Sequence, residues 1–303
     1  MYFESNGKIL LSAEYLVLKG ARALALPAKL TQELYVEETN SDYIHWLSLD
    51  KNKNSWYEEK FFIKDKSIYY KGNKNNISEK IVSLFNHIHL NNNIDKSIGK
   101  RFISKINFNL DWGLGSSSTF VNNLAKWSST DPYELLFSTF NGSGYDIACC
   151  DAKAPIIFSK NINSINVEEI KFNPKFKKNI FLIYSGNKQN TQNSISNFNK
   201  LKFDENSVIK KINQLTNKIV NCNDLYEFEK LIEIHESIIS DVIKIDPIQK
   251  TNFKDYNNGV VKSLGSWGGD FLLVTAQKST DLDFFRDRNY KTIYEMSEMV
   301  YLN

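Results

Sequence analysis

The sequence predicts a soluble α+β protein with two domains. Stretches with strand-like and helix-like patterns of apolar residues occur in an irregular order along the 303 residues, unlike the regular strand–helix–strand order of a doubly wound sheet. A chain of this length corresponds to about two domains at roughly 150 residues each. The stretch from Ser159 to Lys178 is polar, and we place the domain boundary inside it, between domains of residues 1–172 and 173–303.

The composition indicates a folded protein without a polyanionic partner. Hydrophobic residues make up 42% and charged residues 24% of the chain, which excludes wholesale disorder and collagen-like classes. The 38 Lys and Arg residues against 35 Asp and Glu residues leave a net charge of +3, which is too small for a protein that neutralises many nucleic-acid phosphates. We therefore predict no nucleic-acid partner, while a basic pocket for one small anion stays possible.

Three observations predict a cytoplasmic location. The three cysteines, Cys149, Cys150 and Cys222, are too few for a disulfide framework, which indicates a reducing compartment. The first residues lack the basic and apolar segments of a secretory signal. The most apolar early stretch, Tyr15 to Leu30, is interrupted by three basic residues, so we expect no membrane span and no membrane partner. The sequence leaves the oligomeric state open.

Short strands and one helix are predicted before residue 91. The segments Ile9–Leu11 and Ala23–Leu26 read as strands separated by a glycine turn, and Pro27 should end the second of them. Aromatic-rich runs between residues 42 and 76 alternate with Asn, Lys and Gly turns, which predicts further antiparallel strands. Apolar residues at helical spacing predict a helix over residues 78–90.

The rest of the chain mixes strands and amphipathic helices. A strand-like segment over residues 102–110 leads into a glycine turn, and a helix follows it directly. The further expected elements are helices at about 132–140, 205–221 and 224–244 and strands at 155–158, 179–184 and 271–275.

The glycine turn at Gly113–Ser118 has the composition of an anion-binding loop. Glycines allow backbone amides to approach a phosphate, and a helix N-terminus adds a favourable dipole. The pattern lacks the Gly-Lys-Ser/Thr of a Walker A motif and the third glycine of a dinucleotide-binding fingerprint. Taken alone, it fits an ordinary capped helix equally well.

Two further turns carry candidate residues. Asp146 follows the glycine turn at Gly142–Gly144, where it could accept a proton from a substrate hydroxyl or could simply cap a helix. The glycine-rich segment Lys262–Asp270 precedes an apolar strand and, without context, is only a turn. His235 lies on an apolar helical face, so we expect a buried core histidine there.

In this order, the segments resemble the three motifs of the GHMP kinase superfamily, which includes galactokinase, homoserine kinase, mevalonate kinase and phosphomevalonate kinase. The first motif resembles Gly7–Ala25, the second Gly113–Ser118 and the third Lys262–Asp270. Three segments are more similar to phosphomevalonate kinases than to galactokinases. They are Glu14–Tyr15, Gly142–Asp146 and Gly268–Asp270.

The resemblance implies a fold and a set of roles. The N-terminal domain would resemble domain 2 of ribosomal protein S5 and carry the ATP phosphate loop, and the C-terminal domain would be ferredoxin-like. Asp146 would be the catalytic base, and Lys8 would lie beside the transferred phosphoryl group. The ATP phosphates would contact Gly113, Leu114, Gly115, Ser116, Ser117 and Ser118, and Ser117 or Ser118 would bind Mg²⁺. The acceptor substrate would contact Glu14, Tyr15, Gly144, Tyr145, Gly265, Ser266, Gly268 and Gly269.

The chain departs from the family pattern at three places. Ala13 stands where the family often has glycine, and Trp267 replaces a glycine of the third motif. The acidic Mg²⁺ ligand of mevalonate kinases has no clear match, since the nearest acid, Glu134, lies at a different spacing. Mg²⁺ commonly keeps several waters, so a site with few protein ligands is acceptable.

These observations predict an ATP- and Mg²⁺-dependent kinase that phosphorylates a small anionic substrate of the mevalonate pathway in isoprenoid biosynthesis. Phosphomevalonate is the best single substrate, and mevalonate comes second. An ATP-dependent decarboxylase or a non-catalytic member of the same superfamily would also carry these motifs. The extra phosphate of phosphomevalonate should meet Lys or Arg side chains, which the sequence does not locate.

Overall fold

The computed structural model describes residues 1–65, 67–91, 97–162, 164–187, 191–267 and 269–303. The chain forms two compact units, and each unit is assembled from separate segments of the sequence. The first unit contains residues 1–7, 30–110 and 115–151, and the second contains residues 8–29, 111–114 and 152–303. The predicted domain boundary after residue 172 stays a prediction.

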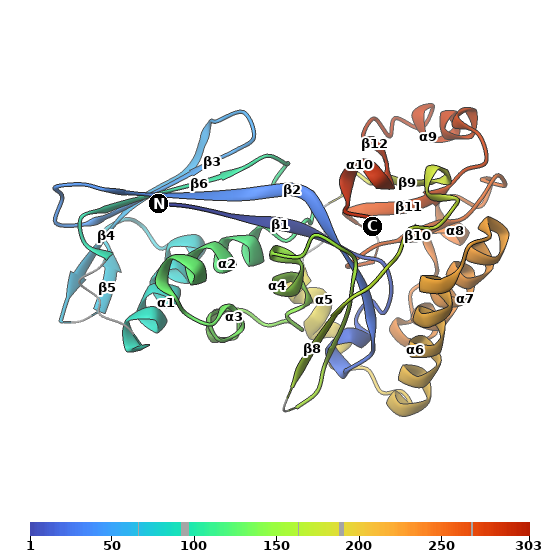
Figure 1. Cartoon of the computed structure of the whole chain (residues 1–303), viewed down its shortest axis with the longest axis horizontal. Helices are drawn as coiled ribbons and strands as arrows, with labels where there is room; N and C mark the ends of the chain where they lie inside the picture. The colour runs from blue at the N-terminus through green and yellow to red at the C-terminus, as the bar shows by residue number, and fades with distance from the viewer. Residues whose placement is uncertain (66, 92–96, 163, 188–190, 268) are drawn as a thin grey trace. The chain divides into compact units, whose positions relative to one another are not determined.

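The first unit is built on a mixed β-sheet (Figure 1). Its strands lie in the order β5 (Ser67–Tyr70), β4 (Ser55–Lys64), β3 (Ile44–Leu49), β6 (Lys100–Ile106) and β2 (Ala23–Glu38), and β1 (Tyr2–Leu10) also pairs with β2. The pairs β5–β4, β4–β3 and β6–β2 are antiparallel, whereas β3 and β6 run parallel. Strands β1 and β2 both continue into the second unit.

Helices cover one face of this sheet and close its core (Figure 1). They are α1 (Asn76–Asn91), α2 (Ser116–Ser128), α3 (Pro132–Thr139) and α4 (Tyr145–Cys150). Every second residue of β3 is buried, as expected for a strand with one face on a core. Trp46 of β3 stacks on Phe102 of β6 at 5.2 Å, and Phe85 of α1 meets both rings edge-on. This aromatic cluster fixes α1 against the sheet.

The second unit contains a four-stranded antiparallel sheet and two further strands that continue the eight-stranded sheet of β2. The sheet order is β10 (Val261–Ser263), β11 (Phe271–Thr275), β9 (Ile180–Tyr184) and β12 (Ile293–Glu295). The first residues of β2 pair with β7 (Ile156–Lys160), which pairs with β8 (Ile165–Glu169). β11 is buried at every position, which accounts for its unbroken apolar sequence.

The helices of the second unit include two long ones, α6 (Glu205–Asn221) and α7 (Leu225–Ile243), which pack against each other (Figure 1). Each begins with an aspartate cap: Asp204 accepts the Ser207 N–H and Asp224 accepts the Glu227 N–H. The shorter helices are α5 (Thr191–Phe198), α8 (Ile248–Thr251), α9 (Asp283–Arg286) and α10 (Met296–Met299), with 3₁₀ turns at Leu16–Lys19, Lys177–Asn179 and Ser279–Leu282.

The structure differs from the sequence expectations at two strands. Pro27 does not end a strand, because β2 continues through it to Glu38. The ladder of β2 with β7 ends at Ala25 and its ladder with β6 begins at Gln32, so neither of these two ladders needs the N–H that Pro27 lacks. The polar stretch also contains a strand, β8, whose exposed side chains hide it from a hydrophobicity pattern.

The expected helices at 78–90, 132–140, 205–221 and 224–244 are confirmed as α1, α3, α6 and α7. Across the described ranges, no helix has both the length and the apolar character needed to cross a bilayer.

Candidate active site

The N-terminus of α2 lies in the first unit and begins with a left-handed glycine. Gly115 has φ 84°, a conformation that only glycine adopts without a steric penalty. Its carbonyl accepts the N–H groups of Ser118 at 2.9 Å and Thr119 at 3.0 Å. The amides that precede these two have no intrahelical acceptor, and the first turn contains no acidic residue. This helix end therefore carries a partial positive charge that suits an anion.

Buried hydrogen bonds fix the start of α2 to the sheet. The Thr119 hydroxyl donates to Gln32 Oε1 at 2.5 Å, and Gln32 Nε2 donates to the Ser104 hydroxyl at 2.6 Å. Asn123 Nδ2 donates to the Gln32 carbonyl at 2.8 Å. The helix end is thus held rigidly by β2, as a preorganised binding loop requires.

Asp146 lies in the first turn of α4, also in the first unit. Gly144 precedes this helix with φ 97°, and a methyl group there would come within 3.2 Å of the rings of Tyr133 and Phe137. Tyr145 is buried, while Asp146 is half-buried. The tight approach of the two aromatic rings thus requires a glycine just before the predicted base.

Each residue of segment 111–114, in the second unit, meets a different neighbour. Tyr184 donates its hydroxyl to Asp111 Oδ2 at 2.7 Å, and the Trp112 ring lies edge-on to Phe271 at 5.5 Å. The Leu114 carbonyl accepts the Lys8 N–H at 3.0 Å. The segment that carries the first glycine of the second motif is therefore attached to β9, β11 and β1.

The remaining residue of this segment, Gly113, lies against Asp270. A methyl group at Gly113 would be 2.2 Å from Asp270 Oδ2, so only glycine fits here. Gly113 and Asp270 both have left-handed backbone, with φ 64° and 54°. The Asp270 N–H donates to the Asn187 carbonyl and its carbonyl accepts the Ser185 N–H, which holds this strained residue in place.

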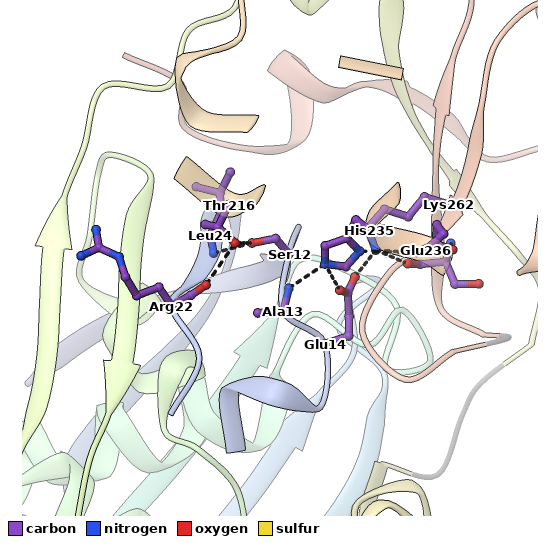
Figure 2. A network of polar contacts seen from close by, with 10 residues as sticks. Ser12, Ala13, Glu14, Arg22, Leu24, Thr216, His235, Glu236 and Lys262 are labelled. Carbon is purple, nitrogen blue, oxygen red and sulfur yellow. Dashed lines mark hydrogen bonds and ion pairs between the residues drawn. The ribbon is translucent and has the colours of Figure 1, made fainter. Parts of the chain in front are cut away.

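A buried ionic cluster connects the first and third motifs within the second unit (Figure 2). Lys262 Nζ donates to Glu14 Oε1 at 2.5 Å, to Glu236 Oε1 at 2.9 Å and to the Ser263 carbonyl at 3.1 Å. Lys262, Glu14 and His235 are fully buried, and Glu236 is 4% exposed. We call these four side chains the Lys262 cluster.

The members of the Lys262 cluster shift one another's pKa. Burial raises the pKa of Glu14, and the Lys262 ammonium offsets this only in part. Burial alone would also raise the pKa of Glu236, but Lys262 and His235 outweigh it and hold the pKa below its usual range. Burial would lower the pKa of Lys262, but the two carboxyl groups raise it instead. The pKa values of the two carboxyl groups that contact Lys262 therefore shift in opposite directions, since burial prevails at Glu14, whereas the lowering effects, led by the Lys262 ammonium, together prevail at Glu236.

The turn of the first motif has strained backbone at two residues. Ala13 has φ 65° and Tyr15 has φ 61°, both in the left-handed region that favours glycine. A glycine would adopt the Ala13 conformation without this strain. The Ala13 N–H donates to His235 Nε2 at 2.9 Å, so the buried histidine, expected from its apolar helix face, helps to hold this turn.

The third motif meets the same turn from the other side. The Tyr15 hydroxyl bonds to the backbone of Trp267 and to the Ser194 side chain, and its ring packs on Phe198 at 5.3 Å. Burial raises the pKa of this hydroxyl. Trp267 is buried, so the residue that replaces a family glycine is part of the packed interior.

The other predicted residues of the third motif follow Lys262. Gly265 has φ 68°, and a methyl group on it would lie 3.9 Å from Asp270 Oδ2. Ser266 and Gly269 are buried, and Gly268 lies outside the described residues.

The predicted site residues divide between the two units. Asp146, Gly144, Tyr145 and Gly115–Ser118 belong to the first unit, and Lys8, Glu14, Tyr15, Gly113, Leu114 and the third motif belong to the second. The pairing of Lys262 with Glu14 and Glu236 was not predicted, although all three are charged residues within otherwise apolar or small-residue segments. Across the described ranges, no group of three or more His, Cys, Asp or Glu side chains is arranged to hold a metal ion.

Comparison with known proteins identifies the fold. No family model matches the chain, and no curated protein sequence matches it. Solved structures match over nearly the full length. The phosphomevalonate kinase of Streptococcus pneumoniae, in complex with phosphomevalonate and AMPPNP, is 12% identical, with 98% of this chain and 100% of that chain covered and a TM-score of 0.70.

Two other kinases are similar to the same extent. The mevalonate kinase of Methanococcus jannaschii is 16% identical, with 100% and 98% of the two chains covered and a TM-score of 0.67. The galactokinase of Lactococcus lactis, complexed with galactose, is 12% identical, with 99% and 93% covered and a TM-score of 0.72. The chain has the fold of the GHMP kinases, which confirms the α+β fold expected from the three motifs.

Proposed function

We propose that this protein is an ATP-dependent kinase that phosphorylates a small molecule. The observation that carries the proposal is the start of α2, where left-handed Gly115 precedes three serines at a helix end with no acidic residue in its first turn. Such an end binds phosphate through backbone amides and the helix dipole. The GHMP kinase fold supports the same conclusion, because its known examples include kinases of mevalonate, phosphomevalonate and galactose.

In the proposed reaction, an acceptor hydroxyl attacks the γ-phosphorus of ATP. The new bond joins the acceptor oxygen to phosphorus, the bond from phosphorus to the β,γ-bridging oxygen breaks, and ADP leaves with that electron pair. Asp146 takes the hydroxyl proton, and the Lys8 ammonium balances negative charge on the transferred group. Amides of the Gly113–Ser118 segment hold the nucleotide phosphates. Most of the rate in such reactions comes from positioning and charge neutralisation.

The donor set of α2 fits a Mg²⁺ ion that reaches the site with ATP. Ser117 is exposed, and Ser118 lies beside it in the first helical turn. Hydroxyl oxygens are ligands that Mg²⁺ accepts, and the ion usually keeps several waters. When bound, Mg²⁺ would neutralise phosphate charge, and Ser117 or Ser118 would supply the protein oxygen. Ser117→Ala should raise the Mg²⁺ concentration needed for half-maximal nucleotide binding.

Phosphomevalonate is the proposed acceptor, with mevalonate as the second candidate. Both choices rest on the resemblance of the Glu14–Tyr15 and Gly142–Asp146 segments, and the matched structures include kinases of both compounds. The acceptor-contacting residues proposed on the same basis are Tyr15, Gly144, Tyr145, Gly265, Ser266, Gly268 and Gly269, whereas Glu14, expected among them, is fully buried. We also propose a role in isoprenoid biosynthesis and a cytoplasmic location.

A substrate screen coupled to ADP release tests the proposal. Purified protein is incubated with ATP, Mg²⁺ and, one at a time, phosphomevalonate, mevalonate, diphosphomevalonate and galactose. We expect ADP release to depend on phosphomevalonate, and we expect no CO₂ to form. Release of CO₂ with diphosphomevalonate would identify a decarboxylase instead, and failure to bind AMPPNP in calorimetry would refute ATP use.

The role of Asp146 is tested by replacing it with asparagine, which keeps its shape but cannot take a proton. Loss of a general base lowers kcat by about two to four powers of ten, and we expect AMPPNP affinity to change little. Asp131→Asn is the matched control, because Asp131 caps α3 in the same unit and asparagine caps equally well. Near-normal turnover by Asp146→Asn would show that the base is another group.

Lys8→Met gives an independent check of the same chemistry. It should lower kcat to a similar extent, and the double variant should lose less than the product of the two effects, because groups that act as one unit are not additive. Full additivity would show that the two residues act separately.

A further inference from the structure

The second oxygen of the Glu14 carboxyl group has an unusual neighbour. Oε1 accepts the Lys262 ammonium, but Oε2 is buried and lies 3.4 Å from His235 Nε2, with no hydrogen-bond donor from the described residues (Figure 2). His235 Nε2 in turn accepts the Ala13 N–H at 2.9 Å. Two acceptor atoms therefore face each other in a fully buried place.

A proton must lie between these two atoms, because a buried oxygen anion facing a nitrogen lone pair would be strongly unfavourable. Nε2 cannot carry this proton, since its ring-plane position is already used to accept the Ala13 N–H. Placing the proton on Glu14 Oε2 removes the anion that would otherwise face the Nε2 lone pair, which the Ala13 N–H already uses. His235 is then neutral with its proton on Nδ1, which lies 3.8 Å from Glu236 Oε1.

The charge count of the cluster agrees with this placement. A neutral Glu14 and a neutral His235 leave one ammonium, Lys262, and one carboxylate, Glu236, at 2.9 Å. With Glu14 ionised and His235 neutral, the buried cluster would carry an uncompensated negative charge, which the interior disfavours. The pKa directions agree with this count, since burial raises the pKa of Glu14 and the Lys262 ammonium holds the pKa of Glu236 low despite its burial.

We infer that Glu14 is a protonated, neutral carboxylic acid in the folded protein and serves as a positioning residue for the first motif instead of contacting the acceptor substrate. This inference rests on the proposed function, because only a kinase gives the first motif a catalytic role. The side chain is fully buried, so it acts through the residues it holds.

The cluster reaches the backbone of both motifs through adjacent residues of α7. His235 accepts the Ala13 N–H of the first motif, and Glu236 Oε2 accepts the Ser263 N–H of the third motif at 3.3 Å. Lys262 then joins Glu14 to Glu236 (Figure 2). The left-handed turn at Ala13 is thereby held in a fixed relation to β10, from which the rest of the third motif continues.

The charged and titratable groups that face Glu14 are few. They are Lys262 from β10, His235 and Glu236 from α7, and the Tyr15 hydroxyl from the same turn, whose pKa is raised in part by Glu14. Because Lys262 and Glu236 form the charged pair, alkaline titration of the cluster begins at Glu14. Loss of its proton would place two negative charges around Lys262 and loosen the Ala13 turn.

Two isosteric variants, each of a carboxyl group that contacts Lys262, test this assignment. In Glu14→Gln, the amide oxygen accepts Lys262 and the amide nitrogen faces His235 without a negative charge, as the protonated acid does, so we expect the melting temperature to change by less than about 3 °C. Glu236→Gln removes the ionised partner of Lys262, so we expect a fall of about 6 to 10 °C. The acceptor KM of Glu14→Gln should stay within about threefold of wild type, a difference typical of a side chain outside the contact surface.

Infrared spectroscopy at pH 8 reports the protonation state of Glu14 directly, which a measurement of stability alone does not. The wild-type protein should show the C=O band of a protonated carboxyl group, and Glu14→Gln should lack it. Glu229→Gln is the matched control, because Glu229 also lies on α7, is bound to Thr275 and has a raised pKa, yet the band assigned to Glu14 should persist in this variant.

Three results would overturn the assignment. They are failure of Glu14→Gln to fold, an equal loss of melting temperature in both variants, and an increase of the acceptor KM beyond about tenfold, a loss expected for a direct substrate contact. If the wild-type protein phosphorylates no acceptor, the proposed function fails, and the melting and infrared measurements still decide whether Glu14 is protonated.

Discussion

Two lysine–carboxylate clusters of this protein differ in their access to water. Lys262 is fully buried between Glu14 and Glu236 in the second unit. Lys126 of α2 pairs with Asp151 in the first unit and also donates to the Glu4 carbonyl at 2.7 Å, but its side chain is 30% exposed and that of Asp151 is 61% exposed. Both lysines bond to a carboxylate and to a backbone carbonyl, but only Lys262 has a second carboxyl group and is closed off from water.

The difference shows that burial, more than the number of contacts, decides what a charge contributes. A buried ion must be compensated within the protein, so the removal of one partner leaves a stranded charge. An exposed ion recovers most of its solvation from water. The Lys262 cluster is therefore a place where single substitutions have large effects and where protonation states are set by neighbours.

The largest effect is expected for Lys262→Met, which strands the Glu236 carboxylate in the interior. The free energy of unfolding should fall by about 3 to 5 kcal/mol, the usual cost of breaking a buried ion pair from one side. Urea denaturation measures it. A loss of unfolding free energy below about 1 kcal/mol, as for an exposed ion pair, would show that water reaches the cluster.

The two carboxyl groups that contact Lys262 should change the stability at opposite ends of the pH range. Each of these effects should be smaller than that of Lys262→Met. The pKa of Glu236 is lowered on folding, so its stabilisation is present above the unfolded value of 4.5 and is lost as the pH falls through the folded pKa. The pKa of Glu14 is raised, so its contribution is present below 4.5 and is lost as the pH rises through its folded pKa.

Melting temperatures measured across the pH range check both signs. Glu236→Gln should flatten the acid side of the stability profile, and Glu14→Gln should flatten the alkaline side. Flattening of the alkaline side by Glu236→Gln and of the acid side by Glu14→Gln would contradict the protonation states derived above.

A buried but uncharged contact should have an intermediate effect. The Thr216 hydroxyl donates to the Arg22 carbonyl at 3.1 Å and accepts from Ser12, which also accepts the Leu24 N–H (Figure 2). Thr216→Val takes the donor from the Arg22 carbonyl and the acceptor from the Ser12 O–H, at a cost of about 1 to 3 kcal/mol. Thr216→Ser keeps the hydroxyl and is the control in the same denaturation experiment.

The smallest effect is expected for Lys126→Met. Loss of an exposed ion pair changes the free energy of unfolding by less than about 1 kcal/mol, and salt should reduce the difference further. Denaturation at low and high ionic strength measures both. A salt-independent loss as large as that of Lys262→Met would remove the contrast between the two clusters.

Much of the local structure could be predicted from the sequence because its signals are local. Helical spacing of apolar residues predicts α6 and α7, and the three ordered motifs predict the GHMP kinase fold. Ala13, noted as a departure from a family glycine, occupies a left-handed position that glycine would adopt without strain. Pro27 was misread as a strand end because its effect depends on which neighbouring strand needs an N–H at that point. The catalytic roles of Lys8 and Asp146 stay predictions.

The sequence by itself determined the helices α1, α2, α3, α6 and α7, the glycine turns, the order of the motifs and the buried place of His235, since each follows from neighbours within a few residues. Only the tertiary structure decided the pairing of Lys262 with Glu14, which lie 248 positions apart, and with Glu236. It also decided the charge of Glu14. The ionisation of a carboxyl group depends on burial and on the groups around it, and those are brought together by folding and not by sequence order.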